Sequence, residues 1–269
     1  MNARHTKPKF LETRMLLNYK QLGEGPDVVL IHGLFGSLEN LNVIAKPLSE
    51  HFRVTNVDLR NHGSSAHSDE MNYPAMAADI VELMNALNIT NAHLIGHSMG
   101  GKVAMEVALM HSQKVNKLVV LDIAPVSYPA RHTQIINALK KVASSQVADR
   151  KQADAIMSEY ISELGVRQFL LKSLAKSEDG EYSWRFNLDV LDKKYSTITA
   201  NVNENNSCLC DTLFIKGNDS DYILPEYRDE ITKRFKNTRA KIIHGAGHWL
   251  HAQKPAAVNK AINDFLTGL

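Results

Sequence analysis

Six short apolar runs rich in β-branched residues recur along the chain, and they restrict its fold more than any other feature. They read DVVLIHG, RVTNVDL, AHLIGHS, KLVVLDIAP, DTLFIKG and AKIIHG, at residues 27–33, 53–59, 92–98, 117–125, 211–217 and 240–245. Runs of this length with few polar interruptions are typical of strands that are buried on both faces of a sheet. The chain is therefore expected to build a sheet that is covered on both sides.

Helical patterns separate these runs. They cover roughly 38–51, 74–88, 99–112, 225–236 and 255–268. Pro74, Pro225 and Pro255 lie near the starts of three of them, where proline removes no helical hydrogen bond. Alternation of strands and helices predicts an α/β fold with a mostly parallel central sheet flanked by helices. The segment 10–22 is expected to add one or two leading strands.

Residues 126–205 interrupt the alternation, because no strand-helix unit fits them. The stretches RHTQIINALKKVASSQ, KQADAIMSEYISEL and VRQFLLKSLAK read as consecutive amphipathic helices, and the aromatic segment GEYSWRFNLDVL follows. We expect a helical cap at 126–205, inserted into a core made of residues 1–125 and 206–269. Open α/β sheets bind ligands at the carboxyl ends of their strands, so this cap would cover a binding site. A surface insertion without a function is the alternative.

Composition excludes several classes of partner. The chain has 269 residues and a formal net charge of +2, and its basic residues are dispersed, so neither nucleic acid nor an anionic membrane surface is indicated. No apolar stretch approaches the length of a membrane span, and MNARHTKPKF at the start lacks the apolar run of a secretory signal. Cys208 and Cys210 are expected to be free thiols, which predicts a reducing compartment, the cytoplasm.

The third apolar run ends in Gly-His-Ser-Met-Gly and passes directly into a helical pattern. A serine at the tip of such a strand-to-helix turn has strained dihedral angles, and glycines at Gly96 and Gly100 let the neighbouring backbone approach. Ser98 is therefore the candidate nucleophile. The backbone N–H of Met99 at the helix start, together with that of Leu34 in HGLFGS, is expected to form an oxyanion hole.

A serine hydroxyl needs a base, and twelve histidines are available. His248 is the best placed, because it lies on a glycine-containing loop between the last predicted strand and the last helix. His97, His244 and His251 are expected to be scaffold or pocket residues. No metal-ligand spacing occurs in the sequence.

The acid that would orient His248 is left open between two strand ends. Asp122 ends the strand after the serine turn, and Asp219 and Asp221 follow the next strand. Aspartates in a loop often cap turns. Asp122 instead stands among apolar neighbours, where an unpaired buried carboxylate would be costly, and this difference favours Asp122.

The segments HGLFGS, DLRNHGSS, GHSMGG, LDIAPV and GAGHWLH, in this order and spacing, resemble those of the α/β-hydrolases over essentially the whole chain. With MNYPAMA and WRFN added, the chain is more narrowly similar to the bacterial esterases of the YbfF type and to related abhydrolase-domain esterases. The resemblance implies Asp122 as the acid and Ser220 as a supporting residue. The loop reads KGNDSDY where GGNS is expected, so Asp219 and Asp221 remain alternatives.

The resemblance implies a serine hydrolase without a cofactor, acting through an acyl-enzyme on a small carboxylic ester or thioester of short to medium acyl length, acyl-CoA included. We expect a monomer or a small homo-oligomer. Apolar walls for the acyl chain are expected from Phe35, Trp184, Phe186 and Trp249. A carbon-carbon bond hydrolase, a cofactor-free haloperoxidase-like enzyme and a non-catalytic ligand-binding protein are the alternatives.

Overall fold

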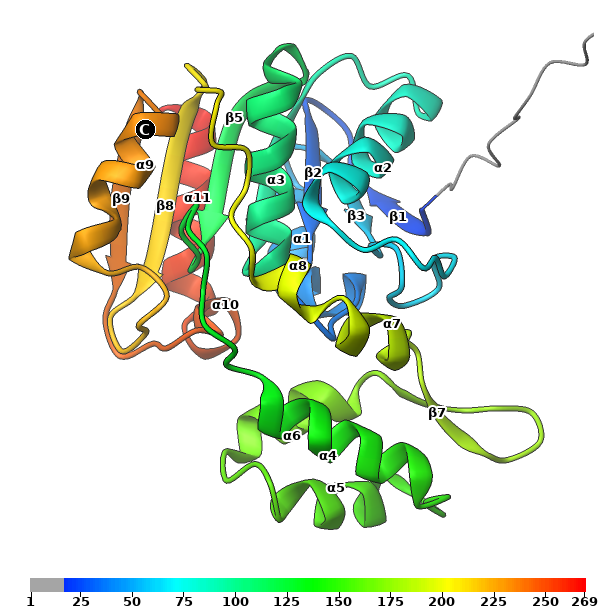
Figure 1. Cartoon of the computed structure of the whole chain (residues 1–269). Helices are drawn as coiled ribbons and strands as arrows, with labels where there is room; N and C mark the ends of the chain where they lie inside the picture. The colour runs from blue at the N-terminus through cyan, green and yellow to red at the C-terminus, as the bar shows by residue number, and fades with distance from the viewer. Residues whose placement is uncertain (1–16) are drawn as a thin grey trace, which may run out of the picture.

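The computed structural model describes residues 17–269, so residues 10–16 of the expected leading segment lie outside the described residues. The main sheet of the described part has seven strands in the order β1-β3-β2-β4-β5-β8-β9 (Figure 1). Their bounds are β1 Tyr19–Leu22, β2 Asp27–Ile31, β3 Arg53–Val57, β4 Ala92–His97, β5 Val115–Leu121, β8 Asp211–Gly217 and β9 Thr238–Ile243. β1 pairs antiparallel with β3, and the other pairs are parallel. The predicted mostly parallel sheet is confirmed.

Helices cover both faces of this sheet. On one face lie α2 (Tyr73–Ala86), α3 (Met99–Met110) and α9 (Arg228–Arg234), and on the other lie α1 (Asn42–Leu48), α10 (Leu250–Gln253) and α11 (Pro255–Thr267) (Figure 1). Short 3-10 turns η1 (Leu38–Leu41) and η3 (Pro225–Tyr227) precede α1 and α9, and η2 (Ser112–Lys114) precedes β5.

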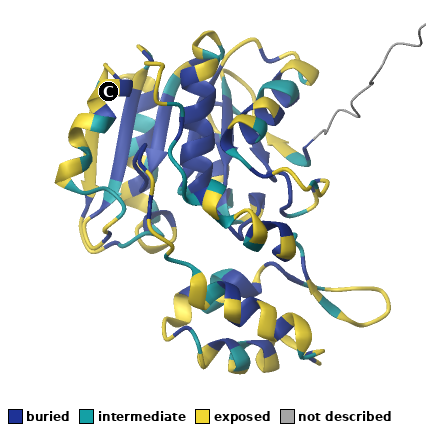
Figure 2. Ribbon diagram, in the orientation of Figure 1, coloured by how far each residue is buried: buried dark blue, intermediate teal, exposed yellow. Residues whose placement is uncertain are grey.

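Strand β2 shows why the central strands read as continuous apolar runs. Val29 and Ile31 join the hydrophobic cluster on the α2 and α3 side, whereas Val28 and Leu30 join the cluster on the α1 and α11 side. Successive side chains of a strand point to opposite faces, so each face of a doubly covered strand needs its own apolar residues. Figure 2 accordingly shows the central strands as buried.

Residues 126–205 lie between β5 and β8, which are neighbours in the sheet. They form α4 (Thr133–Ser144), α5 (Arg150–Ser158), α6 (Leu164–Leu171), β6 (Leu174–Lys176), β7 (Tyr182–Trp184), α7 (Leu188–Lys193) and α8 (Tyr195–Thr199). Helices α4, α5 and α6 form a separate layer beyond the end of the sheet at which β5 ends (Figure 1). The aromatic segment, for which the sequence indicated no element, contributes β7 of the antiparallel β6–β7 hairpin and the start of α7.

Candidate active site

Ser98 stands alone between β4, which ends at His97, and α3, which begins at Met99. Its φ of 54° and ψ of −122° are values that side-chain-bearing residues rarely adopt, at a cost of about 1–3 kcal/mol. A Cβ atom at Gly96 would lie 2.1 Å from the carbonyl oxygen of Gly100, and one at Gly100 would lie 2.2 Å from that of Ile31. Both glycines are thus required for the backbone to pack closely enough to hold the turn.

Substituting Gly96→Ala should abolish the folded turn. The new methyl group meets backbone atoms, which cannot rotate away, so we expect a loss of more than about 4 kcal/mol in the free energy of unfolding. Gly165→Ala in α6 is the matched control, because a Cβ there meets nothing within 4 Å and should stabilise the helix by up to about 1 kcal/mol. Urea denaturation of both variants measures the difference. Equal stabilities would contradict the packing argument.

Three side chains form a continuous hydrogen-bonded chain at the end of β4. The Ser98 hydroxyl lies 2.9 Å from His248 Nε2, and His248 Nδ1 lies 2.8 Å from Asp122 Oδ2. His248 comes from the loop between β9 and α10, and Asp122 directly follows β5. A neutral imidazole that donates from Nδ1 to the carboxylate presents an unprotonated Nε2 to the hydroxyl, so this geometry can remove the proton of Ser98.

The carboxylate of Asp122 is fully buried and lies against three hydrogen-bond donors. Besides His248, it accepts hydrogen bonds from the backbone N–H of Gly217 at 3.0 Å and from the hydroxyl of Ser220. A buried carboxylate is tolerated when such donors replace water. Ser220 thus lies at the place that the resemblance implies.

The two alternative aspartates point elsewhere. Asp219 is exposed, and its carboxylate accepts a hydrogen bond from the side chain of Asn218. Asp221 pairs with Arg131 at 2.6 Å, and its side chain is 69% exposed. The structure therefore brings Asp122 to His248, and it brings neither Asp219 nor Asp221.

The backbone expected to form the oxyanion hole lies beside Ser98. Met99 is the first residue of α3, so its N–H has no acceptor within the helix. A Cβ at Gly33 would lie 3.3 Å from the Cβ of Ser98, which places the turn after β2 directly against the serine. Leu34 follows Gly33 in this turn, and Leu34 and Met99 both line the cavity at Ser98. Two N–H groups can therefore converge on one side of the serine.

Residues 26–255 match the family model described as alpha/beta hydrolase fold. The chain belongs to the alpha/beta hydrolase family. It is 47% identical to Esterase YbfF of Escherichia coli, over 89% of this chain and 92% of that protein. It is 40% identical to the mouse sn-1-specific diacylglycerol lipase ABHD11, over 90% of this chain and 81% of that one. The resemblance predicted from the sequence motifs is confirmed.

A solved structure is also close to this alpha/beta hydrolase. The structure titled marine microorganism esterase matches with a TM-score of 0.91 and 38% sequence identity, and the match covers 93% of this chain and 99% of the other. The agreement extends over the sheet and residues 126–205 alike, since so little of either chain is left out.

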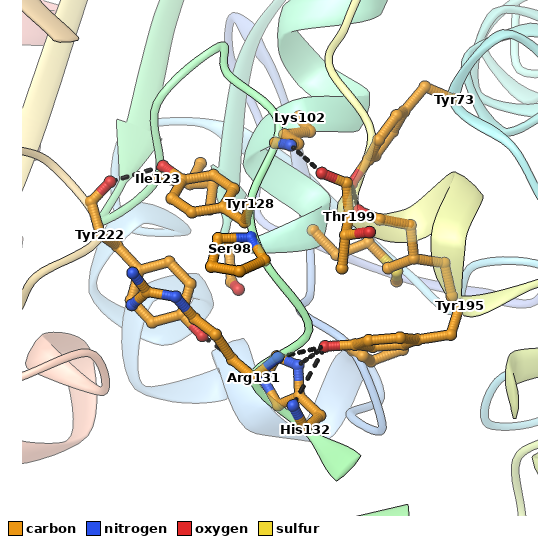
Figure 3. A pocket seen from close by; sticks show the side chains of 14 residues that line it. Tyr73, Ser98, Lys102, Ile123, Tyr128, Arg131, His132, Tyr195, Thr199 and Tyr222 are labelled. Carbon is orange, nitrogen blue, oxygen red and sulfur yellow. Dashed lines mark hydrogen bonds between the residues drawn. The ribbon is translucent and has the colours of Figure 1, made fainter.

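The hydrolase has a cavity that opens at Ser98, and most of its walls were not predicted. Figure 3 shows the side chains around it, which come from segments far apart in the chain. Its volume is about 30 Å³. Its polar walls include Tyr73, Lys102, Tyr128, Arg131, His132, Tyr195 and Tyr222. These residues share no regular spacing in the sequence that could have identified them as pocket residues. Two of the pocket residues predicted from the sequence came instead from the aromatic segment WRFN.

The structure places the four predicted pocket residues in two groups. Phe35 and Trp249 line a second small cavity at Ser98, but Trp184 and Phe186 line neither cavity. Their rings stack at 5.2 Å with an interplanar angle of 11°, and Trp184 Nε1 donates to the carbonyl of Leu139 in α4. The ring of Phe186 lies 5.3 Å from that of Phe35, so the pair packs in the interior behind Phe35. A buried indole is most stable where its N–H finds an acceptor.

Histidines other than His248 hold the loops around Ser98 in place. His62 Nε2 accepts a hydrogen bond from the N–H of Phe35 at 3.2 Å, and His32 Nε2 accepts one from Leu59 at 3.1 Å. Burial lowers the pKa of His62 to about 3, so its ring stays neutral and can accept. These roles of the HGLFGS and DLRNHGSS histidines were not predicted. His97 Nε2 lies 2.9 Å from the carbonyl oxygen of His248, a scaffold contact of the kind expected.

Other expected features concern metals, membranes and thiols. Across residues 17–269, no group of three or more His, Cys, Asp or Glu side chains is arranged to hold a metal ion. In the same part of the chain, no helix is both long enough and apolar enough to cross a membrane. Cys208 and Cys210 are free thiols, with their sulfur atoms 2.8 Å apart.

Proposed function

We propose that this hydrolase cleaves small carboxylic esters through an acyl-enzyme, with Ser98 as nucleophile, His248 as general base and Asp122 as the acid that orients it. The observation that carries the proposal is the chain of 2.9 Å and 2.8 Å contacts from Ser98 through His248 to Asp122. The esterase and lipase relatives confirm the class of enzyme, a carboxylic ester hydrolase.

In the first half of the reaction, His248 Nε2 takes the proton of Ser98 while Oγ attacks the ester carbonyl. The developing oxyanion accepts hydrogen bonds from the N–H groups of Leu34 and Met99. Each such donor contributes about 3 kcal/mol to transition-state stabilisation. The imidazolium of His248 then gives its proton to the leaving alcohol, and the acyl group remains on Ser98.

In the second half, His248 takes a proton from water, the hydroxide attacks the acyl-enzyme, and Ser98 is released with its proton restored. Asp122 stays ionised throughout and holds the Nδ1–H tautomer of His248. Ser220 and the N–H of Gly217 keep the carboxylate of Asp122 in place through their own hydrogen bonds to it. Ser220 is thus a supporting residue, and the reaction requires no cofactor.

The finer assignments belong to the same proposal. Residues 126–205 act as a cap on a core of residues 1–125 and 206–269, since Tyr128, His132 and Tyr195 reach the cavity from that segment. Acyl groups of short to medium length, as oxygen esters or thioesters, are the proposed substrates. A cytoplasmic location, inferred from the free thiols, and a monomer or small homo-oligomer complete the proposal.

A chain-length series tests this function. We expect kcat/KM for p-nitrophenyl esters and acyl-CoAs of two to sixteen carbons to show an optimum that disappears in the Ser98→Ala variant, because hydrolysis depends on the acyl-enzyme. Ester rates no higher than those of the variant across the whole series would contradict the proposal. Such a result would favour carbon-carbon bond hydrolysis, haloperoxidase-like chemistry or a binding role. The ratio of ester to acyl-CoA rates decides between oxygen esters and thioesters.

A further inference from the structure

The two connections that join residues 126–205 to the core lie side by side against α3. The first leaves β5 and contains Val126 and Tyr128. The second consists of the end of α8 and the residues after it, and it contains Ile198, Thr199 and Ala200. The N–H of Tyr128 donates to the carbonyl of Thr199 at 2.9 Å. A single group on α3 can therefore reach both connections.

Lys102 is that group. Its Nζ donates to the carbonyl of Val126 at 2.7 Å and to the carbonyl of Ala200 at 2.6 Å. A longer contact of 3.5 Å reaches the carbonyl of Thr199, and Figure 3 shows the side chain pointing toward this residue. The three N–H bonds of the ammonium thus face three carbonyl groups that belong to both connections.

The surroundings of Lys102 are unusual for a lysine. The residue is only 1% exposed, and none of the ion pairs found among residues 17–269 includes it. Its Nζ lies 4.8 Å from the ring centre of Tyr128 and 5.4 Å from that of Tyr73. Burial lowers the pKa of Lys102 to about 7, whereas the carbonyl groups and the ring faces favour the charged form.

Burying this amine opposes folding, because it removes a charge from water without a carboxylate to balance it. A methionine of similar length would fill the space without a buried charge, but it would leave the carbonyls of Val126 and Ala200 without this donor. The hydrogen bonds of the Lys102 side chain all go to the two connections. We therefore infer that this side chain serves to hold those connections in position.

Two further side chains act on the second connection. Glu106, one helical turn after Lys102 on α3, accepts a hydrogen bond from the N–H of Asn203 at 2.7 Å. The hydroxyl of Tyr73 on α2 donates to the carbonyl of Ile198. The second connection is thus held at Ile198, at Ala200 and at Asn203, whereas Lys102 alone among these side chains also holds the first connection.

We propose that Lys102 is a positioning residue that fastens both connections to α3 and thereby sets the walls of the cavity at Ser98. Tyr128 and Pro129 of the first connection and Ile198 and Thr199 of the second line this cavity beside Ser98. Lys102 itself stands one turn after the serine, and its N–H donates to the carbonyl of Ser98 at 3.1 Å. The effect on substrate selection rests on the proposed esterase function, while the effect on the two connections does not.

The test compares Lys102→Met with Lys117→Met by hydrogen-deuterium exchange and by kinetics. Lys117 is a matched control: its Nζ donates to the carbonyls of Phe265 and Leu266 at 2.9 and 3.1 Å and lies over the ring of Phe265. These contacts tie β5 to the end of α11, away from residues 126–205. Any general cost of losing a lysine bound to carbonyls appears in both variants.

In Lys102→Met we expect exchange of peptides covering 124–132 and 196–204 to accelerate about tenfold. The ratio of kcat/KM for a decanoyl ester to that for an acetyl ester should fall about tenfold, because only the longer chain depends on the cavity walls. Lys102→Arg keeps a cation with several donors and should restore part of both changes. Lys117→Met should leave the exchange of these peptides and the ratio as in the wild type.

Unchanged exchange in Lys102→Met, or equal changes in Lys117→Met, would overturn the proposal. Because methionine in this polar cluster could prevent folding, Tyr73→Phe provides a second test that removes only the hydroxyl bond to Ile198. It should accelerate exchange of the 196–204 peptide and leave that of the 124–132 peptide unchanged. Equal acceleration of both peptides would contradict the assignment of the first connection to Lys102 and not to Tyr73. Failure of the esterase proposal would instead be seen as missing ester turnover in the wild type, with the exchange results unaffected.

Discussion

Replacement of Ser98 by alanine is expected to lower kcat for ester hydrolysis by about a millionfold, the size of effect seen when a serine nucleophile is removed from a working triad. Among the hydroxyl groups of residues 17–269, that of Ser98 is the one hydrogen-bonded to His248 Nε2, and Ser98 lines the same cavity as Leu34 and Met99. The residual rate would come from the oxyanion donors and substrate binding alone. Steady-state kinetics with a p-nitrophenyl ester measures the loss.

The fold of Ser98→Ala should be intact, since the turn depends on Gly96 and Gly100 and not on the hydroxyl. We expect a thermal midpoint within about 2 °C of the wild type. Ser112→Ala, at an exposed position in η2, is the control and should retain full activity. Turnover by Ser98→Ala at more than about one hundredth of the wild-type rate would be incompatible with a nucleophilic Ser98.

Asp122→Asn is expected to lower kcat by about ten-thousandfold while the protein stays folded. The amide offers N–H bonds to His248 Nδ1, so the imidazole adopts the tautomer with its proton on Nε2 and can no longer accept the proton of Ser98. Asparagine tolerates the positive φ of 53° at this position, which limits the cost to the backbone. Kinetics at saturating ester and circular dichroism together separate the loss of activity from any loss of structure.

Asp219→Asn is the matched control for this prediction, and Asp221→Asn a second one. Asp219 is exposed, and among the side chains of the described residues it bonds only to its neighbour Asn218. The kcat of Asp219→Asn should therefore differ from that of the wild type by less than about threefold. Asp221 faces Arg131 and not His248, so the kcat of Asp221→Asn should stay within about an order of magnitude of the wild-type value. The reverse ranking of the three variants would move the acid to the loop after β8.

Much of the fold was readable from local patterns. The runs at 27–33 and 92–98 contain β2 and β4, and the helical pattern at 99–112 contains α3. A strand buried on both faces has to be apolar at every position, and a helix needs its apolar residues at a period of 3.6, so short stretches of sequence carry these signals. The turn at Ser98 was equally readable, because only glycine fits at Gly96 and Gly100.

What the sequence by itself determined about this protein is therefore its sheet, its alternation with helices and the chemistry of the turn between β4 and α3. The apolar neighbours of Asp122 favoured it as the acid, but only the tertiary structure brings it to His248. Tertiary structure alone decided that Tyr128 and Tyr195 line the cavity while Trp184 and Phe186 pack behind it. The ends of neighbouring strands lie about 4.8 Å apart, so strand spacing does not distinguish Asp122 after β5 from Asp219 and Asp221 after β8 as partners of His248. Which one points toward it depends on side-chain directions and on packing between residues distant in the chain, and no local periodicity encodes these.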